Sequence, residues 1–413
     1  MKLKFSFFYP KSCLPFFLLA VATSAFGQTQ LPLVSDADST KPMNMDATYT
    51  RPFLQLGKMP VALGGYVEAN TAWTSEDGVS EGLSFQVPRV TLFASSAIGR
   101  YIKFLTEIEF EEGGREINVE YASMDVQFLP ALNLRGGIIL NPIGAFNQNH
   151  DGPKWEFVNR PVASTQMLPA TWSNAGFGVH GKFYQGPWTF GYETYLTNGF
   201  DESIIDNPEG RTALPEAKEN GERFEESFNG RPLLTAKTAI RHRQIGELGL
   251  SYMGGTFNKF EDDGLTVDKK RQVHVFAVDF NTQLAATATT ILGEWAWVLV
   301  DVPDTYDPQY GNKQYGGHLD IVQQVFSGPI LRWQKAAFNL AARLDYVDWN
   351  VGNFDNTGDS IGDSLFGISG GVGFRPTAQT VIRLNYVYQW KHDLFGNPPA
   401  HLAGWYFGLS SYF

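Results

Sequence analysis

Cysteine is almost absent from this 413-residue chain, which holds only Cys13. That residue precedes an apolar run near the start of the chain, and we expect it to be removed with a secretion signal. The rest of the chain has no cysteine, which excludes a disulfide scaffold, a thiolate metal site and a cysteine nucleophile. The seven histidines are scattered, without a His-x-x-x-His spacing or a clustered carboxylate loop. The sequence therefore predicts no metal site and no cofactor.

Long apolar runs are missing as well. The longest, residues 14–26, is broken by small and hydroxyl residues and is shorter than the roughly 20 apolar residues of a spanning helix. Lysines precede this run, and Ala25-Phe26-Gly27 closes it with a small-x-small cleavage pattern. Residues 1–27 are therefore predicted to be a signal peptide that exports the chain.

Period-two segments recur along the rest of the chain. In residues 100–112, Ile102, Phe104, Ile108 and Phe110 share one face, and Lys103, Glu107, Glu109 and Glu111 share the other. Residues 235–243, 337–349 and 380–391 repeat the pattern. A soluble β-sandwich would bury one face and scatter its charges over the other, whereas apolar-out and polar-in strands are typical of a membrane barrel.

The number of such strands gives the size of the barrel. Candidate strands begin near Val61, Leu83, Arg100, Glu116, Leu132, Ala175, Pro187, Leu233, Gly246, Arg271, Ala286, Tyr315, Ala337, Ser364, Gln379 and Ala400. We expect an all-β, transmembrane antiparallel β-barrel of about 16 strands over residues 59–413, with long outer loops and short periplasmic turns. A phase slip near Ala122 predicts a bulge, and Gly328-Pro329 is either a bulge or a tight turn. Residues 28–58 have no period and are predicted to be a flexible periplasmic lead.

The last ten residues belong to the strand that begins near Ala400, and they alternate up to Phe413. Trp405, Phe407 and Leu409 share a face with it at period two. An aromatic carboxyl terminus of this kind is what the barrel-assembly machinery reads on an outer-membrane barrel. The expected location is the outer membrane of a Gram-negative-type bacterium, with outer-membrane lipid and that machinery as partners.

The segment 141–174 differs from the strands around it. It has no period, and its length makes it either functional or disordered. Its prolines and aromatic residues argue against disorder. We expect it to fold into the barrel as a constriction loop.

Several short motifs in and near this segment resemble one known family. They are Pro142-x-Gly144-x-Phe146-Asn147, His150-Asp151-Gly152-Pro153, Arg160-Pro161, Pro88-Arg89-Val90 and Glu107-Ile108-Glu109. In these motifs the chain resembles the phosphate-selective porin O and P family. The resemblance implies a sixteen-stranded homotrimeric porin with an inward-folded third loop and basic residues that guide small anions.

Candidate anion-binding residues lie on the polar faces of the predicted strands and in the loop. They are Arg89, Lys103, Arg135, Lys154, Arg160, Lys237, Arg241, Arg343 and Arg383, with Lys391 on the same face as Arg383. Aligned cationic groups in a pore can replace part of an anion's hydration shell. Alternatively, these residues pair with luminal carboxylates and brace the wall; the candidates are Glu107, Glu109, Glu111, Glu193 and Asp345.

The net charge of the chain argues against an anion preference. Without residues 1–27, the chain has 29 basic and 43 acidic residues, a net charge of −14. Residues 199–231 alone carry nine acids against four bases. A vestibule of this sign repels anions at long range, although salt limits its reach to about 8 Å.

An enzyme is not predicted. His150 and Asp151 are adjacent, with Ser164 and Ser173 nearby in sequence, but adjacent side chains do not orient one another as a catalytic triad does. They are better explained as residues that fix the loop by local hydrogen bonds. Arg241-His242-Arg243 alternates across a strand, so nucleic-acid binding is not supported. The prediction is a porin for small hydrophilic solutes, especially anions such as phosphate; a plugged structural or adhesive barrel and a general or cation-preferring porin stay open.

Overall fold

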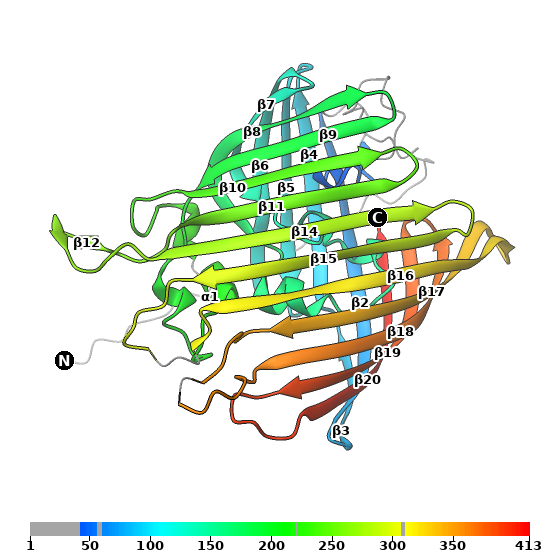
Figure 1. Cartoon of the computed structure of the whole chain (residues 1–413). Coiled ribbons are helices and arrows are strands. Elements are labelled where there is room, and N and C mark those ends of the chain that lie inside the picture. The colour runs from blue at the N-terminus through cyan, green and yellow to red at the C-terminus, as the bar shows by residue number, and fades with distance from the viewer. Residues whose placement is uncertain (1–41, 56–59, 220, 307–309, 355) are drawn as a thin grey trace, which may run out of the picture.

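The computed structural model describes residues 42–55, 60–219, 221–306, 310–354 and 356–413. The predicted signal peptide and residues 28–41 and 56–58 of the predicted lead lie outside these ranges. One antiparallel sheet dominates the structure, and strand β2 (Val61–Glu76) pairs with β20 (Ala400–Tyr412) along eleven residue pairs from Tyr66 to Glu76. In Figure 1 the blue β2 accordingly lies beside the red β20. The sheet thus closes on itself as a barrel.

The barrel has sixteen staves, as the sequence predicts. β3 and β4 together form one stave, interrupted at Pro88, which has no N–H to donate to a neighbouring strand. The remaining barrel strands are β3 (Val79–Gln86), β4 (Arg89–Ile98), β5 (Ile102–Glu111), β6 (Glu116–Leu129), β7 (Leu132–Leu140), β8 (Ser173–Gln185), β9 (Trp188–Thr197), β10 (Leu233–His242), β11 (Gly246–Thr256), β14 (Gln272–Leu284), β15 (Thr289–Val300), β16 (Lys313–Ile330), β17 (Trp333–Asp348), β18 (Ser364–Thr377) and β19 (Thr380–His392).

Both predicted irregularities are bulges. On β6 the pairing with β5 skips Glu120, so that Glu120 and Tyr121 are both buried although they are consecutive. On β16 the register shifts between Gly328 and Ile330, and the tight turn follows at 331–332. The alternative of a turn at Gly328-Pro329 is therefore wrong.

Connections differ in length between the two ends of the barrel. One end has tight turns such as 130–131 and 186–187, and the other end has long connections at 141–172, 198–232, 257–271 and 349–363. The long connections contain helix α1 (Leu214–Glu219), the hairpin of β12 (Glu261–Asp262) and β13 (Leu265–Thr266), and four 3₁₀ helices, Asn147–Asn149, Gly152–Lys154, Glu202–Ile204 and Gly221–Phe224. Within the described ranges, no helix is both long and apolar enough to cross a membrane.

The outward-facing side chains of the strands are apolar and exposed. Leu196 and Leu250, for example, expose 55% and 54% of their surface. Aromatic rings gather at both borders of this band. Trp188 and Trp333 lie beside the tight turns, while Trp295 stacks on Tyr346 near the long connections with ring centroids 6.1 Å apart. An apolar band between two aromatic girdles is typical of a barrel surrounded by lipid.

The inward-facing side chains are polar, as the alternation predicts. Glu107, Lys237, Arg343 and Arg383 are all buried, each on the luminal face of its strand. Apolar packing occurs inside the barrel where long connections enter it. There Ile204 and Leu214 from the 198–232 connection are buried with luminal valines of β14 and β15. The barrel interior therefore contains chain segments as well as wall residues.

Candidate solute pathway through the barrel

Residues 141–172, here called the inner loop, leave the wall after β7 and cross the barrel interior. Ile143, Phe146, Phe157, Met167 and Trp172 are all buried. Two 3₁₀ helices and a short π-helical turn, Ala163–Met167, give the inner loop a defined path. The sequence predicts this inward position from the length and the stiffness of the segment.

One end of the inner loop is held by Glu294 on β15. Its carboxylate accepts hydrogen bonds from the backbone N–H groups of Ala145 and Phe146, both at 2.9 Å, and from the Ser164 hydroxyl. Gly144 is required beside it, because its φ is +66° and an added Cβ would lie 2.4 Å from Glu294 Oε2. Glu294 thus joins two turns of the inner loop to the same stave.

The middle of the inner loop is held by β17, β18 and β19. Arg383 donates to the carbonyl of Trp155 at 2.8 Å, and Arg343 donates to the carbonyl of Asn159, also at 2.8 Å. Arg375 binds the Glu156 carboxylate at 2.6 Å. Three wall arginines therefore position the inner loop, instead of projecting freely into an aqueous channel.

Residues 42–55, here called the N-terminal segment, also lie inside the barrel. Met43, Arg51 and Phe53 are buried, and Leu54–Gln55 (β1) pairs with the start of β2. The described part of the predicted flexible lead is therefore an ordered, buried segment, and that prediction is wrong for residues 42–55. The sequence gives no periodic signal here, because the segment is neither a stave nor a regular helix.

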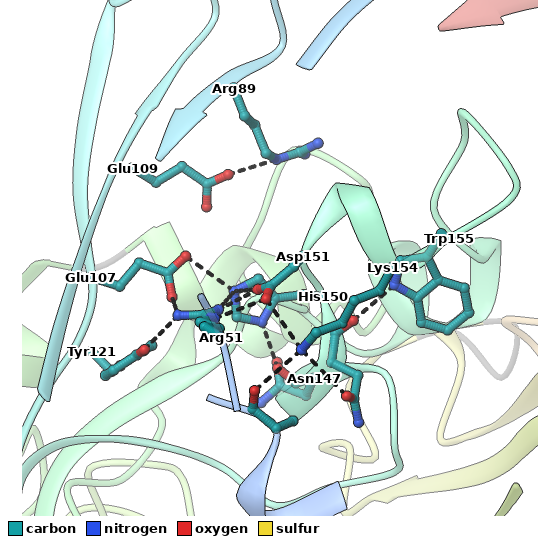
Figure 2. Close-up of polar contacts among 12 residues, drawn as sticks. Arg51, Arg89, Glu107, Glu109, Tyr121, Asn147, His150, Asp151, Lys154 and Trp155 are labelled. Carbon is teal, nitrogen blue, oxygen red and sulfur yellow. Dashed lines mark hydrogen bonds and ion pairs between the residues drawn. The ribbon is translucent and has the colours of Figure 1, made fainter. Parts of the chain in front are cut away.

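Arg51 is the centre of the contacts between the N-terminal segment and the barrel (Figure 2). Its guanidinium donates to Glu107 at 2.7 Å, to the Tyr121 hydroxyl at 2.5 Å and to Asp151 at 2.8 Å. The guanidinium carbon also lies 5.0 Å from the centroid of the Phe93 ring. An arginine has five N–H donors in one plane, so it is well suited to several acceptors arranged around that plane, as they are here.

Asp151 connects the N-terminal segment to the inner loop. Burial alone would raise its pKa, but the charges of Arg51, Lys154 and His150 and the hydrogen bond from Arg51 outweigh burial and hold that pKa well below its ordinary range. A carboxylate whose pKa is lower in the folded chain than in the unfolded chain stabilises the fold at pH values above its unfolded pKa. This stabilisation is lost as the pH falls through the folded pKa. Asp151 therefore stays ionised in mildly acidic solution.

His150, Asp151 and Glu107 are also the residue types that bind metals, and their ligand atoms lie within 4.8 Å of one another. The Arg51 guanidinium occupies the position where a cation would be held. His150 in addition contacts the carbonyl of Asn147 at 2.8 Å. The cluster is thus explained by an arginine, and it does not fit a metal ion as it stands.

The nine predicted anion-binding residues lie in the barrel interior, but they do not form a free ladder, and Lys391 at the end of β19 is exposed. Eight of the nine are within ion-pair distance of a carboxylate, and Lys103 lies in the electrostatic field of Asp125. The pairs are Arg89 with Glu68, Glu109 and Glu111, Arg135 with Asp125 and Glu193, Lys154 with Asp151, Arg160 with Glu109, Lys237 with Asp279, Arg241 with Glu247, Arg343 with Asp320, and Arg383 with Glu68.

Arg160 forms the ion pair with the longest distance. Its guanidinium lies 3.8 Å from Glu109, and 14% of its side chain is exposed. By contrast, Arg343 is 2.6 Å from Asp320, and both side chains are only 2% exposed. Arg160 thus has the longest ion-pair distance of these residues and lines the remaining open space, although Lys154 and Arg89 expose more of their side chains.

Sequence reasoning missed several residues of this interior. Glu68, Asp125, Asp279 and Asp320 lie on luminal faces, and the alternation of their strands could have identified them. Arg51 had no such signal, because the segment around it has no period. Its role depends on contacts with residues 56, 70 and 100 positions away along the chain.

An open space of about 250 Å³ remains between the inner loop and the wall formed by β17–β20. The loop contributes Phe157, Val158, Asn159, Arg160, Val162, Thr165 and Gln166, and the wall contributes Arg343, Asp345, Ser369, Asn385, Val387, Gln389 and Tyr406. Most of these groups are amides, hydroxyls and paired charges. The lining is thus hydrophilic.

No protein-family model matches the chain. A stretch of 149 residues is 33% identical to an uncharacterized protein from Aquifex aeolicus (strain VF5); the match covers 34% of this chain and 33% of that protein. The chain therefore matches about a third of the length of that relative.

Solved structures establish the fold class. An anion-selective porin from Comamonas acidovorans has a TM-score of 0.53 and 12% identity, covering 86% of this chain and 99% of that one. OprB from Pseudomonas putida has a TM-score of 0.53 and 12% identity, with coverage of 86% and 94%. The outer membrane channel DcaP of Acinetobacter baumannii has a TM-score of 0.52 and 11% identity, with coverage of 86% and 97%. With its lipid-facing outer band, the protein is an outer-membrane β-barrel with the porin fold.

Proposed function

We propose that the protein is a porin through which small hydrophilic solutes diffuse across the outer membrane. The open, hydrophilic space between the inner loop and β17–β20 is the observation that carries this proposal. Its polar lining can replace part of a solute's hydration, while the paired charges prevent very tight binding. Passage without retention is what a diffusion channel requires.

The same contacts support a channel over an enzyme. The Ser164 hydroxyl donates to Glu294, and Asp151 binds Arg51, so both groups stabilise the inner loop. His150 contacts the Asn147 carbonyl. Because each member of the tempting His-Asp-Ser set has a structural partner, a nucleophile–base–carboxylate relay is not what this arrangement supports.

Within the channel class, we propose an anion preference set locally at Arg160. This residue borders the open space and has the longest ion-pair distance of the predicted arginines. Phosphate would be one such anion, as the resemblance to the phosphate-selective porin O and P family implies. The pairing of the other basic residues makes strong phosphate selectivity a weaker proposal than general passage of anions. A homotrimer, also implied by the resemblance, would show as a crosslinked trimer in detergent.

A plugged structural or adhesive barrel is the second candidate, and a specific observation favours it. The inner loop, the N-terminal segment and part of the 198–232 connection all occupy the interior. Electrical conductance distinguishes the two candidates, because a plugged barrel carries no steady ionic current.

Single-channel recording in planar lipid bilayers tests the proposal. We expect steady unitary currents and, in a potassium chloride gradient, a reversal potential that reports anion preference. Arg160→Glu should shift the reversal potential toward cations, while Arg332→Glu, in the exposed β16–β17 turn, should leave it unchanged. Absence of any current would favour the plugged barrel. A cation-selective wild-type channel would replace the anion proposal with a general or cation-preferring porin.

A further inference from the structure

We infer that the N-terminal segment is an intramolecular plug, and that the barrel interior contains a guanidinium-binding site whose ligand is Arg51. This inference rests on the proposed channel function, because a plug has meaning only where solutes pass. It concerns residues 42–55, whereas the channel proposal rests on the inner loop and β17–β20. The two can therefore be tested separately.

The binding site is assembled from four parts of the barrel. Glu107 comes from β5, Tyr121 from β6 and Asp151 from the inner loop, and each accepts at least one hydrogen bond from the guanidinium of Arg51. Phe93 on β4 supplies an aromatic face at 5.0 Å. The Arg51 side chain and both carboxylates have no exposed surface. Two carboxylates, a phenol and a ring face select a planar, delocalised cation over a compact ammonium ion.

The rest of the N-terminal segment is held by both polar and apolar contacts, and Phe53 is buried in a cluster with Tyr66 and Phe93. The backbone N–H of Asn44 binds Glu247 on β11 at 3.1 Å, and its side-chain amide binds Asp279 on β14 at 3.1 Å. Asp46 accepts a hydrogen bond from Lys182 on β8 at 2.6 Å. Water in an open lumen can replace the polar contacts of the segment, whereas withdrawal of Phe53 removes it from its apolar cluster.

The N-terminal segment and the inner loop both occupy the interior. The segment contacts the wall from β4 to β14. The inner loop is fixed to β15, β17, β18 and β19, and it also contacts Glu193 on β9, Lys237 on β10 and Ser251 on β11. Asp151 connects the two, because it binds Arg51, Lys154 and the Tyr412 hydroxyl. Loss of the Arg51 contact would free the part of the interior that the N-terminal segment fills, while the inner loop keeps its wall anchors.

The test compares Arg51→Ala with the wild-type protein in planar bilayers. We expect a larger unitary conductance, roughly twofold, because the N-terminal segment is one of two segments that together occupy the lumen. Adding guanidinium ion at roughly 10–50 mM, a range suited to a millimolar dissociation constant, should return the conductance of the variant toward the wild-type value. Sodium at the same concentration should not. Arg51→Lys should conduct more than wild type, since an ammonium cannot fill the fork of acceptors.

Arg332→Ala is the matched control, because it removes an exposed arginine from the β16–β17 turn. It should neither raise the conductance nor respond to guanidinium. Heat-dependent migration in SDS gels identifies folded barrels, and if Arg51→Ala does not fold, Arg51→Lys carries the test. Folded variants with wild-type conductance and no response to guanidinium would overturn the plug and leave the porin intact. A silent wild type with a conducting Arg51→Ala would support the plug, and silence of both would overturn both proposals.

Discussion

Arg343 on β17 shows how the partners of a luminal arginine determine whether its charge can attract a solute. Two of its nitrogens lie 2.6 Å from the Asp320 oxygens, and a third donates to the inner loop. Removing one partner of such a buried pair leaves the other charge unpaired and lowers the free energy of unfolding by about 3–5 kcal/mol. Its charge therefore contributes to the position of the inner loop more than to the attraction of anions.

Gly144 provides a test at this scale. Gly144→Ala would strain a φ of +66° and push a methyl group against the Glu294 carboxylate. We expect weaker contacts from the inner loop to Glu294, a loss of about 1–3 kcal/mol in stability, and noisier open-channel current. Gly78→Ala is the matched control, since Gly78 has a φ of +82° but nothing within 4 Å of an added Cβ. Equal noise in both variants would show that backbone strain alone, and not the Glu294 contact, is responsible.

The inner loop is the decisive element, because wall arginines and Glu294 hold it from several sides of the barrel. Pro142 and Pro161 limit its flexibility, and its backbone groups bond both within the loop and to charged groups of the wall, as Val162 does to Asp345. Under the proposed function, we expect an element held in this way to narrow the channel without closing the side along β17–β20.

Deletion of residues 148–165 tests the constriction. It removes Asp151 together with most of the inner loop, so both the loop and the anchor of Arg51 are lost. Unitary conductance should increase more than in Arg51→Ala, since both obstructing segments are then free to leave the lumen. Deleting 261–266, the exposed β12–β13 hairpin, should leave conductance unchanged. A correctly folded 148–165 deletion with unchanged conductance would reject the constriction role.

For the whole molecule, net charge and local charge make opposite predictions about selectivity. The chain is strongly acidic, and residues 199–231 carry many of the acids. Asp206, Glu219, Glu225 and Glu226 are exposed there, so salt screens them, whereas Arg160 acts at short distance beside the open space. Selectivity measured at physiological salt should thus follow the local charge.

Neutralising exposed acids of residues 199–231 tests whether the net charge or the local charge sets the selectivity. With Asp206→Asn, Glu219→Gln, Glu225→Gln and Glu226→Gln combined, we expect little change of reversal potential at about 0.15 M salt, where the Debye length is about 8 Å. A larger shift toward anions should appear at about 0.01 M, where that length is about 30 Å. A full shift already at physiological salt would show that the vestibule, and not Arg160, sets the preference.

The sequence by itself determined the staves and their faces. Alternation depends only on neighbouring residues, so Glu107, Lys237 and Arg383 could be placed on luminal faces, and the bulge in β6 could be located from a phase slip. The inward position of the inner loop also followed from local composition. These features persist in any barrel built from this chain.

Only the tertiary structure decided which charges meet. Arg343 lies opposite Asp320 because β16 and β17 pair in one register, and a different register would have left both groups unpaired. The N-terminal segment shows the limit most clearly: Asn44 binds Glu247 across 203 residues, and Arg51 binds Asp151 across 100. No local pattern encodes such contacts, because they exist only once the barrel has closed around the segment.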